Sequence, residues 1–184
     1  MKRLAVFAAA IAVAVASPCA ATSSTLAPDE SPAALMAASA AVATARDHAE
    51  EIGANRPLKP GGYWWSSDMP ADGDTEVVVS LEDQRAYVYR AGELIGVTTI
   101  SSGKPGKDTP PGIFPILEKK KMHRSRKYDD APMPFMQRID QYGIALHAGH
   151  IPGEPASHGC VRLPAAFAAK LFNMTKVGDR VVIG

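Results

Sequence analysis

One short segment of the sequence combines a thiol with residue types that commonly activate one. Cys160 lies in the run Ser157-His158-Gly159-Cys160-Val161-Arg162-Leu163, and His147 ends an apolar run upstream. A free thiol has a pKa of about 8.5 and is only partly ionised at neutral pH, so a cysteine nucleophile needs a base within hydrogen-bond reach. His147 and His158 are both candidates. The nearer one, His158, is two residues from Cys160, and residues two apart on an extended segment share a face. The pattern predicts nucleophilic catalysis by Cys160.

The residues that flank the cysteine suit the same chemistry. Gly159 allows a close backbone approach to a substrate and leaves amide N–H groups free to face an oxyanion. Arg162 lies on the same side as Cys160 if the segment is extended. Three functions are open to its cation: to lower the thiol pKa, to orient the loop or to hold a substrate carboxylate.

Two other interpretations of Cys160 do not involve catalysis. A free cysteine is often a small buried hydrophobe, but that leaves the flanking histidine, glycine and arginine unexplained. The other interpretation is a zinc site, because imidazole and thiolate groups suit this metal. Its ligands would be His147, His150, His158 and Cys160. The irregular spacing of these residues and the Pro-rich loop between them disfavour zinc.

The N-terminus has the composition of a secretory signal peptide. A short basic start precedes thirteen apolar residues, 4–16, and then small residues, 17–21. This order predicts a signal peptide over 1–21, and the apolar run is too short to span a bilayer. Cys19 allows a lipoprotein as an alternative, although Pro18 fits a lipid-attachment motif poorly. Cleavage after Cys19 would leave Cys160 as the only cysteine, which excludes an internal disulfide.

The charge gives no reason to expect a polyanionic partner. The formal net charge is +1, and loss of Lys2 and Arg3 with the signal peptide changes it to about −1. A near-neutral chain offers no argument for binding nucleic acid. No later segment is apolar enough to span a membrane.

Composition changes near residue 76. Residues 22–75 are rich in Ala and Pro and predict a tether, with a partial helix over 33–49 that has few large apolar residues and would pack weakly. Within it, Tyr63-Trp64-Trp65 is expected to be an aromatic clasp on the domain surface or, alternatively, a lip that contacts ligand. Residues 76–184 have the turn-punctuated apolar runs of a single folded domain.

The pattern of residues 76–184 favours a mainly β fold. A short helix is expected over 164–172, after the cysteine, with proline near its start. About seven short strands and one helix predict a β-sandwich or barrel-like domain. The predicted strands are Val77–Leu81, Arg85–Arg90, Leu94–Ile100, Ile113–Leu117, Met133–Ile139, Tyr142–His147 and Val181–Ile183.

At these residues the sequence resembles the L,D-transpeptidase catalytic domain, the YkuD-like family of bacterial cell-wall enzymes. The resemblance covers about 76–184. Its most specific part is Ser157-His158-Gly159-Cys160-Val161-Arg162. The other matching segments, in the right order, are Ser101-Ser102-Gly103-Lys104-Pro105-Gly106, Thr109-Pro110-Pro111-Gly112-Ile113-Phe114, Ala131-Pro132-Met133-Pro134-Phe135 and Ile144-Ala145-Leu146-His147.

The resemblance implies roles for particular residues. Cys160 would be the nucleophile. His147, rather than the nearer His158, would donate and accept protons, oriented by the backbone carbonyl of Ala148, a position at which the match is loose. Ser157, His158, Gly159 and Arg162 would form the pocket and the oxyanion site. No metal and no cofactor would be needed.

The resemblance also implies a reaction and a partner. The chain would be a cysteine acyltransferase that acts on peptidoglycan stem peptides in cell-wall biogenesis and cell shape, exported to the periplasm as a monomer. Cys160 would form a thioester with a stem tetrapeptide, release D-Ala and transfer the acyl group to an amine, making a 3→3 cross-link. Carbapenems typically acylate the cysteine of such enzymes.

Three alternatives remain open at this point. Water would make the chain a carboxypeptidase or endopeptidase, whereas a protein lysine would make it an enzyme that attaches proteins to the wall or detaches them. A third alternative is a wall-binding module without catalysis, tethered by residues 22–75.

Overall fold

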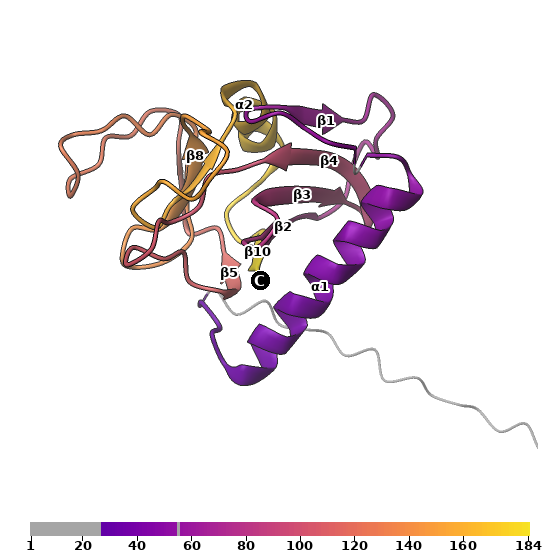
Figure 1. The fold of residues 1–184 in the computed structure, drawn as a ribbon, viewed down its shortest axis with the longest axis horizontal. Coiled ribbons are helices and arrows are strands. Elements are labelled where there is room, and N and C mark those ends of the chain that lie inside the picture. Colours follow the sequence, from indigo (N-terminus) through magenta and orange to yellow (C-terminus); the bar gives the residue numbers. More distant parts are fainter. Residues whose placement is uncertain (1–26, 55) are drawn as a thin grey trace, which may run out of the picture.

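The computed structural model describes residues 27–54 and 56–184. The predicted signal peptide, 1–21, lies outside the described residues. The described chain forms two sheets and two helices (Figure 1). The six-stranded sheet has the order β1 (Tyr63–Trp65), β4 (Glu93–Thr99), β3 (Arg85–Arg90), β2 (Thr75–Ser80), β10 (Arg180–Ile183), β5 (Gly112–Pro115). The four-stranded sheet has the order β6 (Glu118–Lys120), β7 (Met136–Arg138), β8 (Ala145–Ala148), β9 (Val161–Leu163). The helices are α1 (Pro32–Glu51) and α2 (Ala165–Met174).

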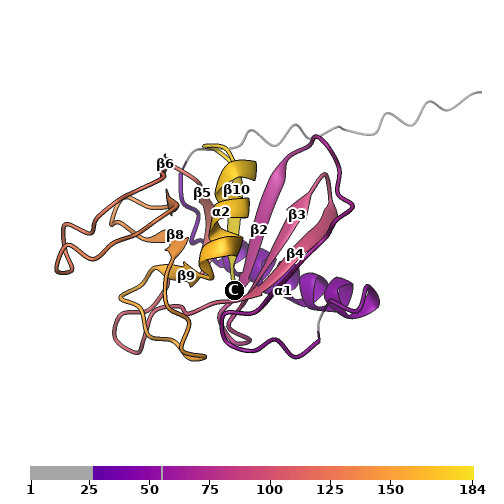
Figure 2. The ribbon, with the colours of Figure 1, turned by 90° about the horizontal axis from the view of Figure 1, so that it is seen from above.

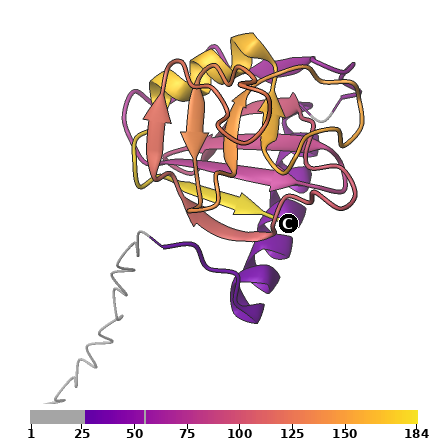
Figure 3. The same cartoon turned by 90° about the vertical axis from the view of Figure 1, so that its left-hand side faces the viewer.

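The main core lies between the two sheets. Alternate residues of β2, such as Val77 and Val79, face this core, and α2 contributes Phe167 and Leu171 to it. Figure 1 shows α2 at one end of the space between the two sheets, Figure 2 shows the same arrangement from above, and Figure 3 shows the strands of one sheet running across those of the other. The mainly β, sandwich-like fold is therefore confirmed, with α2 as the short helix that follows Cys160.

The Ala-rich stretch packs more closely than its composition predicts. It forms α1, which begins after Ser31, whose hydroxyl accepts the Ala34 N–H at 3.2 Å. One side of α1 covers the outer face of the six-stranded sheet (Figure 1). Small side chains allow the helix backbone to approach the sheet, which large side chains would prevent. The buried residues of α1 are Ala34, Ala38, Val42, Ala45 and Ala49. The expectation of weak packing is wrong, whereas the boundary of a tether at residue 75 stays a prediction.

The aromatic residues before the main domain pack on its surface. Tyr63 and Trp65 belong to β1, which pairs with β4. The Trp65 ring meets the ring of Phe167 in α2 edge-on, at 5.1 Å between centroids, and Tyr63 meets the same ring at 5.7 Å. These contacts match the surface-clasp interpretation rather than the ligand lip. No helix among the described residues is long and apolar enough to cross a membrane.

All seven predicted strands are found among the described residues, and three further strands were not predicted. The bounds of β3 are as expected, whereas β7 is shorter because Met133–Phe135 belong to a loop. The unpredicted strands β1, β6 and β9 have three residues each. Runs of that length are too short for an alternation of apolar and polar residues to be recognised.

Candidate active site

Two adjacent parallel strands bring the predicted site residues together. In the register of β8 and β9, His147 lies opposite Arg162. The intervening residues Leu146 and Val161 face the core, so His147 and Arg162 project from the outer face of the sheet. Cys160 lies one residue before β9 and packs against Ala145, on this same face. His147, Arg162 and Cys160 therefore share the outer face of the β8–β9 pair.

A backbone carbonyl holds the ring of His147. Its Nδ1 lies 2.9 Å from the carbonyl oxygen of Ala148, and the side chain is buried. A carbonyl only accepts hydrogen bonds, so Nδ1 carries the proton and donates it. In the neutral ring Nε2 then has a free lone pair, which is the form of histidine that accepts a proton. This is the contact that the resemblance implies for this residue.

The surroundings of His147 favour its neutral form. Burial lowers the pKa of His147, because a buried cation loses hydration. The hydrogen bond to the Ala148 carbonyl acts in the opposite direction, and the charges of Arg162 and His123 lower the pKa further. The net effect is a pKa below the ordinary value, so the ring is uncharged at neutral pH.

Cys160 is held as a neutral thiol. Its Sγ lies 3.7 Å from the carbonyl oxygen of Gly143, which accepts the S–H. Burial raises the pKa of Cys160, and the Asp140 carboxylate raises it further. A hydrogen bond from the backbone of Ala145 and the charge of Arg162 lower it, but the net shift is upward. Arg162 therefore acts on the thiol pKa in the expected direction, and burial outweighs it.

An aspartate shapes the turn that faces the thiol. One carboxylate oxygen of Asp140 accepts the backbone N–H groups of Tyr142, Gly143 and Ile144 at 2.9, 2.7 and 2.7 Å. Asp140 is 4% exposed. Three short bonds to one oxygen fix this turn, which joins β7 to β8 and presents the Gly143 carbonyl to Cys160.

The loop before Cys160 is closed by Ser157. Its buried hydroxyl accepts the N–H of Gly159 at 3.0 Å and donates to the carbonyl of Cys160. Gly159 has φ +114°, a conformation that L side chains rarely adopt, and a Cβ there would lie 2.6 Å from Cδ1 of Ile144. A glycine is therefore required immediately before the cysteine.

His158 and Arg162 have different surroundings from one another. His158 is exposed, and its ring stacks on Tyr128 at 4.4 Å between centroids. The stem of Arg162 runs along Gly149, where a Cβ would lie 2.9 Å from Cγ of the arginine. In the part of the chain that the structure describes, the guanidinium of Arg162 makes no ion pair and no side-chain hydrogen bond.

The zinc alternative finds no matching cluster. Residues 27–54 and 56–184 contain no group of three or more His, Cys, Asp or Glu side chains placed to hold a metal ion. His150 is exposed, whereas His147 is buried on β8. The four proposed ligands therefore do not converge.

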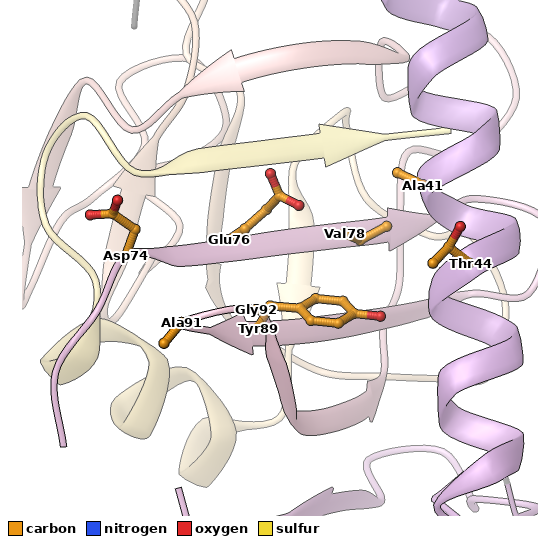
Figure 4. A pocket seen from close by; sticks show the side chains of 8 residues that line it. All are labelled: Ala41, Thr44, Asp74, Glu76, Val78, Tyr89, Ala91 and Gly92. Carbon is orange, nitrogen blue, oxygen red and sulfur yellow. The ribbon is translucent and has the colours of Figure 1, made fainter. Parts of the chain in front are cut away.

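A groove of about 540 Å³ lies elsewhere, between α1 and the β2–β3 hairpin (Figure 4). Asp74, just before β2, and Glu76 of β2 lie along it, and Tyr89 of β3 and Thr44 of α1 line it too. None of the predicted site residues lines this groove, and Asp74 and Glu76 are paired with Lys176 and Arg180. The predicted nucleophile and base lie instead at the β8–β9 face.

The YkuD L,D-transpeptidase catalytic domain matches residues 74–183 of the chain. The chain belongs to this family. An L,D-transpeptidase from Stackebrandtia nassauensis is 29% identical, with a TM-score of 0.57 and coverage of 75% of this chain and 64% of that one. An L,D-transpeptidase from Mycobacterium smegmatis is 24% identical, with a TM-score of 0.56 and coverage of 60% and 58%. L,D-transpeptidase 3 from Mycobacterium tuberculosis, in complex with a faropenem-derived adduct, is 24% identical, with a TM-score of 0.56 and coverage of 60% of each chain. This chain spans only 58–64% of the lengths of these proteins. No curated protein matches it.

Within this YkuD domain, two site residues were not identified from the sequence. Asp140 has a detectable signal, because Asp-Gln-Tyr-Gly is a typical turn composition in which an aspartate bonds nearby N–H groups. Tyr128 has none, since only the path of the 121–135 loop brings it onto His158. Both residues lie outside the Ser157–Leu163 segment that contains Cys160.

We expect alkylation of Cys160 by iodoacetamide to accelerate as pH rises, with a midpoint above about 8.5, the ordinary value for a free thiol. Burial raises the pKa of Cys160 and lowers that of His147, so the resting pair is thiol and imidazole rather than thiolate and imidazolium. The measurement is the rate of mass gain of the peptide that contains Cys160, which excludes any contribution from Cys19. A rate that already reaches its plateau below about pH 7 would show a resting thiolate and contradict this assignment.

Proposed function

We propose that the chain is an exported peptidoglycan L,D-transpeptidase in which Cys160 is the nucleophile and His147 is the general acid and base. The observation that carries the proposal is the shared outer face of β8 and β9, with His147 Nδ1 committed to Ala148 and Nε2 left with its lone pair. Membership of the YkuD family supports the same reaction class.

In the first step, His147 Nε2 takes the proton of Cys160, and Sγ attacks the carbonyl carbon of the third residue of a stem tetrapeptide. The C=O electron pair moves to the oxygen, which becomes an oxyanion. When the intermediate collapses, the C–N bond to the terminal D-Ala breaks and His147 returns the proton to the leaving amine. The product is a thioester on Cys160.

In the second step, an amine of another stem peptide attacks the thioester carbonyl. His147 takes a proton from that amine, the C–S bond breaks, and the thiol is regenerated as the proton returns to sulfur. The result is a 3→3 cross-link. These steps transfer an acyl group without any change of oxidation state, so the residues of the β8–β9 face account for the chemistry.

The backbone N–H of Cys160 is the best-placed oxyanion donor. The N–H of Gly159 is occupied by the Ser157 hydroxyl. Among the described residues, no acceptor is found for the N–H of Cys160. A donor that is free in the resting enzyme and adjacent to the nucleophile stabilises the negative charge that develops on the substrate oxygen.

The charge and exposure of two neighbours suit a peptide that ends in a carboxylate. Arg162 shares the face of Cys160 and makes no ion pair with the described residues, so it is proposed to hold a carboxylate of the stem peptide. His158, stacked on Tyr128, is proposed to form the opposite wall of the pocket. The structure of L,D-transpeptidase 3 from Mycobacterium tuberculosis is a complex with a faropenem-derived adduct. Adduct formation in that protein supports the proposal of an acyl-accepting site in this chain.

The acyl acceptor is decided by product analysis. Incubating the full chain with a disaccharide-tetrapeptide is expected to give cross-linked dimers and free D-Ala, separated by liquid chromatography and identified by mass. Disaccharide-tripeptide without dimers would assign the reaction to water as acceptor and overturn the transferase assignment. Recovery of unchanged tetrapeptide would overturn the proposal as a whole.

Export to the periplasm is part of the proposal. The supporting observation is the order of residues 1–21, in which a basic start, an apolar run and small residues follow one another. A peptidoglycan substrate lies outside the cytoplasm, so the reaction and the N-terminal segment are consistent.

A further inference from the structure

A buried threonine hydroxyl connects the loop 101–109 to the peptide bond that precedes the nucleophile. Thr109 is 4% exposed. Its Oγ1 accepts the backbone N–H of Gly103 at 2.9 Å and donates to the carbonyl oxygen of Gly159 at 2.8 Å. Thr109 itself takes no part in the proposed proton transfers, and its only O–H donates to the carbonyl of Gly159.

The contact with Gly159 determines the direction of the N–H that was assigned to the oxyanion. The carbonyl of Gly159 and the N–H of Cys160 belong to one peptide unit. In a trans peptide these two groups are coplanar and point in opposite directions. By holding the carbonyl on one side, Thr109 directs the Cys160 N–H to the other side, where no acceptor from the described residues meets it.

This peptide unit needs an external support. A peptide that follows a glycine is less restricted than others, because a residue without Cβ imposes few steric limits on its own dihedral angles. Gly159 also has φ +114°. Thr109, in contrast, is well restrained, since it is buried and precedes Pro110, which confines the preceding residue to extended conformations. The restrained Thr109 therefore holds the backbone of Gly159, whose own dihedral angles are less restricted.

We propose that Thr109 is a positioning residue, whose hydroxyl orients the Gly159–Cys160 peptide so that the Cys160 N–H faces the developing oxyanion. The inference rests on the proposed acyl transfer, because an oxyanion forms only when sulfur attacks a carbonyl. It assigns Thr109 no contact with the substrate. The expected consequence of losing the hydroxyl is a slower attack on carbonyl compounds, with the reactivity of the sulfur itself preserved.

Two reactions of the same sulfur separate these effects. Acylation by a carbapenem opens the β-lactam C–N bond through a tetrahedral oxyanion. Alkylation by iodoacetamide displaces iodide from a saturated carbon and forms no oxyanion. In Thr109→Val, which keeps the shape of the side chain but lacks the hydroxyl, we expect carbapenem acylation to slow by about 10- to 100-fold, below the loss of a whole oxyanion donor. Alkylation should stay within about twofold of wild type, since no donor is involved in it.

Thr109→Ser keeps the hydroxyl and is expected to restore most of the acylation rate. Thr175→Val is a matched control, because Thr175 is also a buried threonine, bonded to Gln137 at 2.6 Å and away from the Cys160 loop. It should leave the ratio of the two rates unchanged. Melting curves check that each variant is folded, and Thr109→Ala replaces Thr109→Val if the valine variant is not.

Two results would overturn the inference. One is acylation of Thr109→Val at the wild-type rate. The other is an equal slowing of acylation and alkylation, which would mean that the whole loop is disturbed. Failure of the wild-type protein to form any carbapenem adduct would count against the proposed function as well, and is distinguishable because it appears without any substitution.

Discussion

Cys160→Ala is expected to reduce conversion of disaccharide-tetrapeptide to the background level, a loss of at least about 10³-fold in kcat/KM. The substitution removes the sulfur that carries the acyl group, and no neighbouring side chain on the β8–β9 face can form an equivalent thioester. Cys160→Ser should be nearly as inactive, because a hydroxyl has a far higher pKa than a thiol and an imidazole activates it poorly in a site arranged for sulfur. The measurement is release of D-Ala with time by full-length variants.

The fold provides a control for this result. Cys160 is only partly buried beside Met133, Met136 and Ala145, so an alanine at this position leaves a small gap at the edge of a cluster rather than a core cavity. We expect the melting temperature of Cys160→Ala to remain close to that of wild type. Substantial turnover by a folded Cys160→Ala variant would remove the cysteine from the mechanism.

His147→Asn is expected to lower kcat/KM by about 10²- to 10⁴-fold, the usual contribution of a general acid and base. Asparagine keeps a polar group near the Ala148 carbonyl but offers no group that titrates near neutral pH. Because burial lowers the pKa of His147, wild-type activity should persist below about pH 6.5, the ordinary midpoint of histidine, and decline only as pH falls through the lowered value. The variant should lose this acidic limb, since the group that titrates is absent.

His158→Asn is the matched control for the choice between the two histidines. His158 is next to the nucleophile in sequence but is exposed and stacked on Tyr128. We expect its replacement to cost less than about tenfold in kcat/KM and to leave the acidic limb in place, because a residue of the pocket wall contributes binding rather than proton transfer. A larger loss for His158→Asn than for His147→Asn would reverse the assignment.

The roles of the two histidines illustrate where sequence reasoning ends. Proximity along the sequence favoured His158, and only the family resemblance favoured the more distant His147. The pairing of β8 with β9 places His147 opposite Arg162, on the face of the sheet where Cys160 packs against Ala145. β9 has three residues and no recognisable pattern, so the pairing is a tertiary property that the local sequence does not encode.

The thiol pKa depends on tertiary burial in the same way. The sequence indicated an arginine near Cys160, and its charge acts in the predicted direction. Burial was not visible from the segment, because it comes from Met133, Met136 and the turn closed by Asp140. The larger effect on the thiol pKa is therefore burial by residues remote in sequence. It raises the pKa of Cys160, whereas the nearby arginine alone would lower it.

The strands of the six-stranded sheet, apart from β1, were the easiest part to predict. Runs such as Arg85–Arg90 and Val181–Ile183 are rich in β-branched and aromatic residues and are bounded by turn residues. The packing of α1 was not predictable from hydrophobicity, because its buried strip consists mainly of alanines whose value lies in their small size. Composition describes how apolar a helix face is, but not how well its shape matches a sheet.

The nucleophile can be identified by intact-mass analysis of the full chain after incubation with a carbapenem. We expect a single adduct with the mass of the carbapenem, located by peptide mapping on the fragment that contains Cys160 and missing from Cys160→Ala. A wild-type protein that gains no mass, or a Cys160→Ala variant that gains the same adduct, would contradict the assignment of Cys160 as the acyl-accepting nucleophile.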